Sequence, residues 1–269
     1  MKSIQNILAV IDDFKLSRDI LKRSIELAQK FNANIIILYT VQIPFFDLPY
    51  YKKEVPIDKN RVKNRIDTIF NSLNSTNIKH HTLVYFGDSS DRAIIEAKRD
   101  NIDLIIIGEQ IKFEKLLRES QKSLLIIKRE YKEYKNILIP TDLTLKSKNS
   151  IEFSKRTFNS ADFSLVYGYE SVAVAMSMYD IGYIDMIEYQ EENREIALNI
   201  FKDFQKDVGV IGELTDSMLS LNYGILDYIK RKNPDLVVVA SHSSEDSFFV
   251  GSTSSYLAKE TPSDIFIFN

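Results

Sequence analysis

The chain has 269 residues, of which 44% are hydrophobic and 27% charged, and its formal net charge is -3. This composition is typical of a globular protein long enough for two domains, and it excludes a disordered chain. The absence of cysteine excludes disulfides, thiolate metal ligands and a cysteine nucleophile, and the slight acidity argues against a surface for nucleic acid.

The first half of the chain alternates between two hydrophobic patterns. Unbroken apolar runs occupy residues 7–11, 35–38, 104–107 and 124–127. Such runs favour strands that are covered on both faces, as in a parallel sheet. Between them, apolar residues recur at helical spacing over residues 16–31 and more weakly over 61–73 and 91–99. The order predicts a doubly wound α/β domain with five parallel strands.

The second half follows the same order. We expect its five strands near residues 137–140, 164–167, 217–221, 236–240 and 264–268, with helices between them. The charged residues of the stretch 128–135 alternate in sign, which is typical of a solvated connector.

The two halves are copies of one another. Asn-Ile-Leu at 6–8, Asp12 and Ser17 return 130 positions later as Asn-Ile-Leu at 136–138, Asp142 and Ser147. Residues 102–107 return at 234–239, and residues 123–126 return at 263–266. The repeat predicts two domains of one kind, residues 1–130 and 136–269. The second copy has eight more residues in the loop that contains Gly251, Ser252 and Thr253.

Several motifs carry a resemblance to a known family. Residues 137–142 read Ile-Leu-Ile-Pro-Thr-Asp, residues 234–243 read Pro-Asp-Leu-Val-Val-Val-Ala-Ser-His-Ser, and Gly251-Ser252 follows; the first copy has Gly87-Asp88. These motifs resemble the universal stress protein family, in a tandem form that covers nearly the whole chain. The resemblance implies adenine-nucleotide alpha-hydrolase-like domains, an intramolecular pseudo-dimer that pairs residues 124–127 with 265–268, and a role in the stress response.

Nucleotide-binding members of this family carry a loop of Gly, two residues, Gly, nine residues, then Gly and Ser or Thr. Here Ala240 and Ser243 stand at the first two glycine positions, and seven residues instead of nine separate Ser243 from Gly251. The resemblance thus implies an adenine nucleotide (ATP, ADP or AMP), with Mg²⁺, in the second copy. We predict no catalytic residue and at most slow ATP hydrolysis.

The residues expected at this site follow from the position of parallel strand ends. Glycine lets the backbone approach a phosphate, and a helix that starts at Ser252 would point free N–H groups at it. The predicted binding residues are Pro140, Thr141, Asp142, Gly168, Ala240, Ser241, His242, Ser243, Gly251, Ser252 and Thr253. The segment 251–253 is either part of a nucleotide site or a simple helix start, because Ser252 and Thr253 are also ordinary helix caps. The acidic Glu245 and Asp246 in the same loop would repel a triphosphate. Asp142 is a ligand contact or a turn cap.

The first copy is expected to bind no nucleotide. Gly108 leads almost directly into the helix around Leu116, so no Gly-Ser-Thr segment is left to enclose phosphates. For Asp12 we favour a capping role. We interpret the first copy as a partner surface, and two nucleotides per chain would contradict this.

Two further segments offer alternatives to nucleotide binding. Residues 43–51 and the segment 172–189, which is rich in methionine and tyrosine, join the second and third strands of the two copies. The second segment suits an apolar ligand, a homodimer or another protein partner, although packing within the chain is the simpler reading. The alternative functions are therefore a nucleotide-free scaffold and a binder of apolar small molecules.

Targeting signals are not evident. The first apolar stretch ends at Asp12 and Asp13, which is too short for a signal peptide, and no apolar stretch approaches the about 20 residues of a membrane span. We expect a cytoplasmic protein without membrane or nucleic-acid partners.

Overall fold

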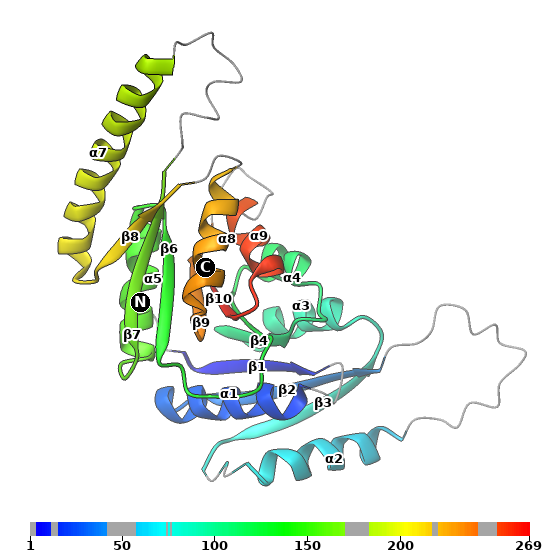
Figure 1. Ribbon diagram of the computed structural model, residues 1–269. Helices are drawn as coiled ribbons and strands as arrows, with labels where there is room; N and C mark the ends of the chain where they lie inside the picture. The colour runs from blue at the N-terminus through cyan, green and yellow to red at the C-terminus, as the bar shows by residue number, and fades with distance from the viewer. Residues whose placement is uncertain are drawn as a thin grey trace, which may run out of the picture. The chain divides into compact units, whose positions relative to one another are not determined.

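The computed structural model describes residues 4–11, 16–41, 58–73, 75, 77–169, 183–216, 220–241 and 252–269 (Figure 1). The chain forms two compact units: unit 1 is Met1–Lys132 with Asn269, and unit 2 is Glu133–Phe268. Each unit contains a parallel sheet and helices.

In unit 1 the strands lie in the order β3-β2-β1-β4-β5, and all neighbours are parallel. The strands are β1 (Asn6–Ile11), β2 (Asn34–Val41), β3 (His80–Phe86), β4 (Leu104–Gly108) and β5 (Ser123–Ile127). The helices are α1 (Ser17–Phe31), α2 (Lys59–Asn71), α3 (Ser89–Arg99) and α4 (Phe113–Ser120). The winding reverses between β1 and β4, which places the open end of the sheet at the carboxyl ends of these two strands.

Unit 2 repeats this order as β8-β7-β6-β9-β10, again with parallel neighbours. Its strands are β6 (Asn136–Thr141), β7 (Asp162–Gly168), β8 (Gly212–Thr215), β9 (Leu236–Ala240) and β10 (Asp264–Phe268). Its helices are α5 (Leu145–Thr157), α7 (Tyr183–Val208), α8 (Leu221–Lys232) and α9 (Ser252–Glu260). The predicted doubly wound α/β fold is confirmed. The expected pairing of the final strands of the two copies stays a prediction.

The central strands form the core because helices cover both of their faces. All residues from Ile7 to Ile11 have no exposed surface, and all five residues of β9 are buried. This explains the unbroken apolar runs, since neither face of these strands alternates with polar residues.

The third strand of unit 2 lies earlier in the sequence than predicted. Instead of residues 217–221, the strand is β8, and Leu221 begins α8. The Ser220 hydroxyl caps this helix by accepting a hydrogen bond from Tyr223 N–H at 3.4 Å. The strand was missed because its four residues, Gly-Glu-Leu-Thr, include only one large apolar side chain. Residues 217–219 lie outside the described part of the chain.

The two copies share a hydrogen-bonded clamp at the amino ends of their first strands. In unit 1 the Asp103 carboxylate accepts hydrogen bonds from Gln5 and Asn6 N–H at 2.8 and 3.1 Å. In unit 2 the Asp235 carboxylate accepts from Lys135 and Asn136 N–H at 2.8 and 2.9 Å. Each clamp joins the start of the first strand to the residue that precedes the fourth strand.

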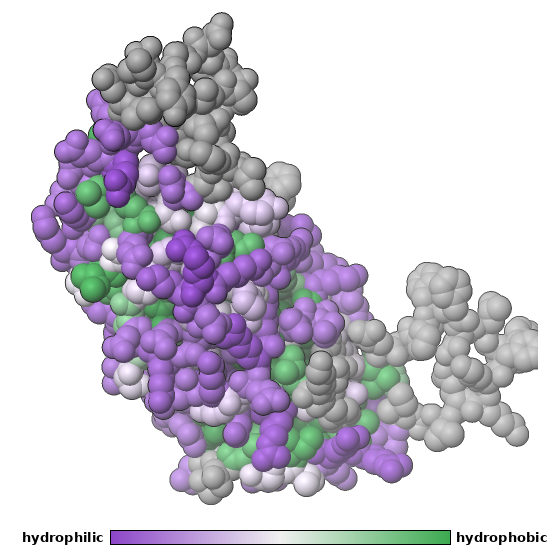
Figure 2. Space-filling view, viewed as in Figure 1, coloured by the Kyte–Doolittle hydropathy of each residue, from purple (hydrophilic) through white to green (hydrophobic). Residues whose placement is uncertain are grey.

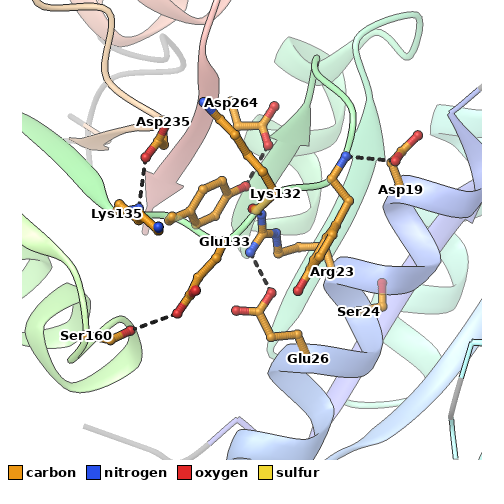
Figure 3. Close-up of polar contacts among 12 residues, drawn as sticks. Asp19, Arg23, Ser24, Glu26, Lys132, Glu133, Lys135, Ser160, Asp235 and Asp264 are labelled. Atoms are coloured by element: carbon orange, nitrogen blue, oxygen red, sulfur yellow. Dashed lines mark hydrogen bonds and ion pairs between the residues drawn. The ribbon is translucent and has the colours of Figure 1, made fainter.

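The stretch 128–135 is more than the solvated connector that its charges predicted (Figure 3). On the unit 1 side, Tyr131 N–H donates to Asp19 at 2.8 Å, and the buried Arg23 donates to the Lys132 carbonyl at 2.6 Å. On the unit 2 side, the buried Tyr134 hydroxyl donates to the Asp264 carboxylate at 2.7 Å. The connector is thus bound at each end to the unit in which that end lies, while Lys132, Glu133 and Lys135 are exposed.

Among the described residues, no helix is both long enough and apolar enough to cross a membrane.

Candidate functional site

A pocket of about 350 Å³ lies in unit 2 at the carboxyl ends of β6, β7 and β9. We call it the strand-end pocket. It is lined by Pro140, Thr141, Asp142, Ser147, Tyr167, Gly168, Tyr169, Leu221, Ile225, Val239, Ala240, Thr253, Ser254 and Leu257. Six of the predicted binding residues are in this list: Pro140, Thr141, Asp142, Gly168, Ala240 and Thr253. The parallel sheet brings them together because its strand ends meet at one edge.

The turn between β6 and α5 forms one wall and orients Asp142. One carboxylate oxygen of Asp142 accepts hydrogen bonds from the Thr144 N–H at 3.0 Å, the Thr144 hydroxyl at 2.7 Å and the Ser147 hydroxyl at 2.5 Å. The Thr141 hydroxyl accepts from Leu143 N–H at 3.1 Å. Asp142 therefore has the turn-capping role that the sequence left open, and it also lines the pocket.

This turn is held in an uncommon backbone conformation. Leu143 has φ of 63°, in the left-handed region that a branched side chain rarely adopts. A non-glycine residue in this region costs on the order of 1 kcal/mol, which the hydrogen bonds of Thr141 and Asp142 offset.

Gly168 at the end of β7 was expected to leave space for a base. A Cβ at this position would lie 2.3 Å from Leu221 Cδ1 and 3.2 Å from Ile225 Cγ1. The missing side chain is thus used for the close approach of α8, and Leu221 and Ile225 then line the pocket.

The opposite wall comes from the end of β9 and the start of α9. The buried Ser254 hydroxyl donates to the Ala240 carbonyl at 3.0 Å, which fixes α9 against the strand end. Ser241 N–H donates to the Phe268 carbonyl at 2.8 Å. Ser241 is buried and does not line the pocket. His242, Ser243 and Gly251 lie outside the described residues, as do Glu245 and Asp246; Ser252 begins α9, and its side chain is not described.

Lys146, in the first turn of α5, places a cation beside this end of the sheet. Its ammonium group donates a hydrogen bond to the Ser241 hydroxyl at 3.0 Å. The side chain is half-buried, and burial lowers the pKa of Lys146 from the ordinary value of a lysine. A nearby anion would oppose this shift, because it stabilises the protonated form.

The same end of unit 1 is built differently. β4 ends at Gly108 and α4 begins at Phe113, and Ile111 N–H bonds the Gly108 carbonyl at 3.3 Å. A Cβ at Gly108 would lie 3.6 Å from Ile20 Cδ1 and 3.8 Å from Leu16 Cδ1. Leu16 occupies the position in the repeat that Lys146 occupies in unit 2. Asp12 lies outside the described residues.

Sequence reasoning missed several residues of the site. Tyr167, Tyr169, Leu221, Ile225, Val239, Ser254 and Leu257 line the pocket but follow the ordinary patterns of strands and helices, so nothing in the sequence distinguishes them. Lys146 had a detectable signal, because the repeat aligns it with an apolar residue of the first copy.

The described residues contain no group of three or more His, Asp or Glu side chains that could hold a metal ion.

The chain is similar to known proteins in both sequence and fold. The model of the "Universal stress protein family" matches the chain twice, at residues 3–128 and 133–269. A universal stress protein from Archaeoglobus fulgidus has a similar structure, with a TM-score of 0.66 and 15% identity over 100% of this chain and 99% of that chain. A functionally unknown protein from Pseudomonas aeruginosa PAO1 has a TM-score of 0.66 and 14% identity over 99% of this chain and 92% of that chain. No curated protein matches the chain. At these identities the structural likeness shows the fold alone.

Proposed function

Since the chain belongs to the universal stress protein family, we propose that it is a stress-response protein that binds an adenine nucleotide in the strand-end pocket of unit 2. Family membership supports the stress-response role. The ligand and its position are our inference from the pocket.

The pocket itself is the observation that carries the proposal. Its volume of about 350 Å³ is in the range of small-molecule sites, and it lies at the edge where doubly wound sheets bind ligands. Leu221, Ile225, Val239 and Leu257 supply apolar surface for a base. Thr141, Asp142 and Thr253 supply hydroxyl and carboxylate groups that can bind ribose.

The phosphates would lie toward the start of α9 and Lys146. The first turn of a helix directs unpaired N–H groups and the positive end of its dipole toward an anion. Lys146 adds a full positive charge, which replaces part of the binding that both missing glycines of the family loop would provide. This arrangement favours a nucleotide over an uncharged nucleoside.

We propose that the site supports at most slow hydrolysis. The Asp142 oxygen that accepts three hydrogen bonds holds the turn and is poorly placed to accept a proton from water. We therefore propose a binding and signalling role. In this role, occupancy of the pocket by nucleotide would control the binding of a protein partner.

Titration calorimetry with ATP, ADP and AMP in Mg²⁺ buffer tests the proposal, together with mass spectrometry of what co-purifies. We expect one nucleotide per chain. Ala240→Leu adds three carbons to a pocket-lining residue and should abolish binding by filling the pocket. Gly108→Ala, at the aligned position of unit 1, meets only ordinary contacts and should leave binding unchanged.

Three outcomes would contradict the proposal: no heat with any of the three nucleotides, binding that survives Ala240→Leu, or two nucleotides per chain. The first outcome would favour the nucleotide-free scaffold. An extracted apolar compound would favour the alternative ligand class of residues 172–189, of which 172–182 lie outside the described part of the chain.

A further inference from the structure

A second pocket, of about 430 Å³, lies in unit 1 at the amino ends of β1, β2 and β3, beside the end of α3. We call it the amino-end pocket. Ile36 is its one apolar lining residue, and the other eight have polar side chains. On the face that Figure 2 shows, hydrophilic residues predominate among the coloured atoms, and hydrophobic ones lie in small groups. A polar lining alone therefore does not mark a binding site, and the internal repeat provides a stricter criterion.

Unit 2 shows which of the polar lining residues are common to both copies. Asn6 corresponds to Asn136, and Asn101 corresponds to Asn233. Asn101 and Asn233 have the same left-handed backbone, with φ of 48° and 44°, a conformation that asparagine adopts more readily than most residues. These two asparagines of the pocket are therefore explained by the fold.

The residues that lead into the third strand differ between the copies. The strand registers align residues 79–81 of unit 1 with residues 209–211 of unit 2. These segments read Lys-His-His in unit 1 and Gly-Val-Ile in unit 2. The same edge of the sheet thus forms without polar side chains at this place, so the fold alone does not require Lys79 and His81. His80 has a structural role, because its ring centroid lies 4.0 Å from that of Phe70.

The acceptor groups of the amino-end pocket are used within the protein. The side-chain oxygen of Asn6 accepts a hydrogen bond from Asn34 at 3.1 Å, and the Asn101 carbonyl accepts from Asn6 at 3.4 Å. The Asp100 carboxylate accepts two hydrogen bonds from the Arg99 guanidinium, at 3.1 and 3.4 Å. These bonds fix the orientation of the side chains that form the floor of the pocket.

Donor groups remain at the same pocket. Among the residues that the structure describes, the side chains of Lys79, His81 and Asn101 form no hydrogen bond or ion pair, and all three are exposed. An ammonium group can only donate, whereas an imidazole and an amide can both donate and accept. A ligand that fits these three side chains therefore offers oxygen acceptors, some of which can also donate.

The charges around the pocket leave no positive surplus. Lys79 and Arg99 are cationic, but the carboxylates of Asp67, Glu96 and Asp100 stand against them. Glu96 and Asp100 both form ion pairs with Arg99, so the guanidinium is already neutralised within the protein. A phosphate or a carboxylate would therefore gain little here, and the nearly uniform polar lining offers little surface to an apolar ligand.

We propose that the amino-end pocket binds a small, neutral, polyhydroxylated molecule, that is, a sugar or a polyol. Hydroxyl groups accept hydrogen bonds from Lys79, and they both accept from and donate to His81 and Asn101. The volume of the pocket lies in the range of small-molecule sites. Because these side chains are exposed, each new hydrogen bond replaces one to water, and we expect a dissociation constant of about 1–10 mM. The proposal does not depend on nucleotide binding in unit 2.

NMR of the histidine rings tests this site in the intact chain. The chain has three histidines, so the imidazole C–H signals form a small set that substitutions can assign. D-glucose, trehalose and myo-inositol are each added at constant pH up to about 100 mM. We expect a saturable shift of the His81 signal. The signal of His242, which belongs to unit 2, should stay unchanged and serves as the internal reference.

A lysine pair distinguishes binding in the pocket from a general effect on the surface. Lys79→Ala removes an exposed ammonium group of the lining, and it should raise the midpoint of the titration about five- to tenfold through the loss of one hydrogen bond. Lys98→Ala is the matched control, because Lys98 is an exposed lysine of α3 that does not line the pocket. Sodium phosphate at matched ionic strength should give no saturable shift of His81.

A His81 signal that does not move with any of the three compounds would overturn the proposal. Equal shifts of all three histidine signals would also do so, since they indicate a change of the solvent and not a site. The same holds for an unchanged midpoint in Lys79→Ala. A saturable shift with phosphate would show that the pocket selects anions and not neutral hydroxyl compounds.

Discussion

The two units have the same sheet but different carboxyl ends. In unit 1 the side chains of Leu16 and Ile20 lie over Gly108, and the turn to α4 is short. In unit 2 the corresponding positions are Lys146 and Ser150. The Ser150 hydroxyl is turned to its own helix, where it donates to the Ser147 carbonyl at 2.7 Å. Unit 2 thus has a pocket where apolar side chains cover the sheet of unit 1. The differences that accompany the pocket are Lys146 in place of Leu16, Ser150 in place of Ile20, and a longer loop before α9.

The amino ends of the first strands did not diverge in this way. Asp103 and Asp235 make equivalent hydrogen bonds to the chain that enters the first strand of each unit. We infer that the amino ends of the first strands serve stability, and we propose that the carboxyl end of unit 2 serves binding. Each of the following predictions tests one side of this comparison.

The largest expected effect is the loss of a clamp. Asp235→Ala leaves two backbone N–H groups without their acceptor, and because Asp235 is 7% exposed we expect a loss of about 2–3 kcal/mol in the free energy of unfolding. Asp103→Ala, in a half-buried clamp, should cost somewhat less. Urea denaturation measures both. Asp235→Asn keeps an acceptor oxygen and should be milder; equal losses for Asn and Ala would argue that hydrogen bonding is not the cause.

The next effect concerns the pocket. Lys146→Leu gives unit 2 the residue of unit 1, and we expect ATP affinity to fall about 10- to 100-fold, the equivalent of one charge-assisted hydrogen bond. Adenosine, which carries no charge, should bind with nearly unchanged affinity in the same calorimetric titration. Lys148→Leu, which removes an exposed lysine paired with Asp207, is the control. Equal losses for ATP and adenosine would show that Lys146 does not act through phosphate.

The same variant has a pH signature in the ligand-free protein. Burial lowers the pKa of Lys146, so the unfolded chain binds this proton more tightly than the folded chain does. Stability therefore rises with pH from the folded pKa to the unfolded pKa. We expect this alkaline gain in the original chain and its absence in Lys146→Leu.

A smaller effect is expected at the connector. Tyr134→Phe removes the hydroxyl that donates to the buried Asp264, with an expected loss of about 1–2 kcal/mol in the free energy of unfolding. The first copy has Ile4 at the position of Tyr134 and Leu124 at that of Asp264, so it has no such bond to lose. An unchanged midpoint for Tyr134→Phe would contradict the assignment.

The smallest effect belongs to the exposed pair of Glu213 and Lys232, at 2.8 Å. The hydrogen bond from Lys232 lowers the pKa of Glu213, so the contribution of Glu213 exists above its unfolded pKa and is lost as the pH falls through its folded pKa. Glu213→Gln should lower the thermal midpoint by less than about 2 °C at neutral pH, and by nothing in acid where the pair is already broken. Glu213 also has a hydrogen bond with Tyr228, so a larger shift, or one that persists in acid, would point to that contact and not to the ion pair.

Sequence reasoning succeeded where side chains repeat with a strong pattern. The hydrophobic patterns located eight of the ten strands, because a strand covered on both faces must be apolar throughout. The exceptions are β3, for which no apolar run gave a position, and β8, which lies earlier than the sequence predicts. The two internal copies also indicated which strand ends would meet, since a doubly wound sheet has one edge where the carboxyl ends converge. The charge pattern of the connector did not indicate the hydrogen bonds of Tyr131 and Tyr134, because their partners lie far away in the sequence.

The sequence by itself determined the fold and the internal repeat, and it predicted the edge of unit 2 at which we propose that a ligand binds. Only the tertiary structure decided that Asp142 caps its turn, that Gly168 admits α8, and that Lys146 reaches Ser241. The physical reason is that strands and helices follow from local periodicity, whereas a pocket is made by side chains from five separate segments. The distances between these segments are set by packing, and the residue pattern of a single segment does not predict them.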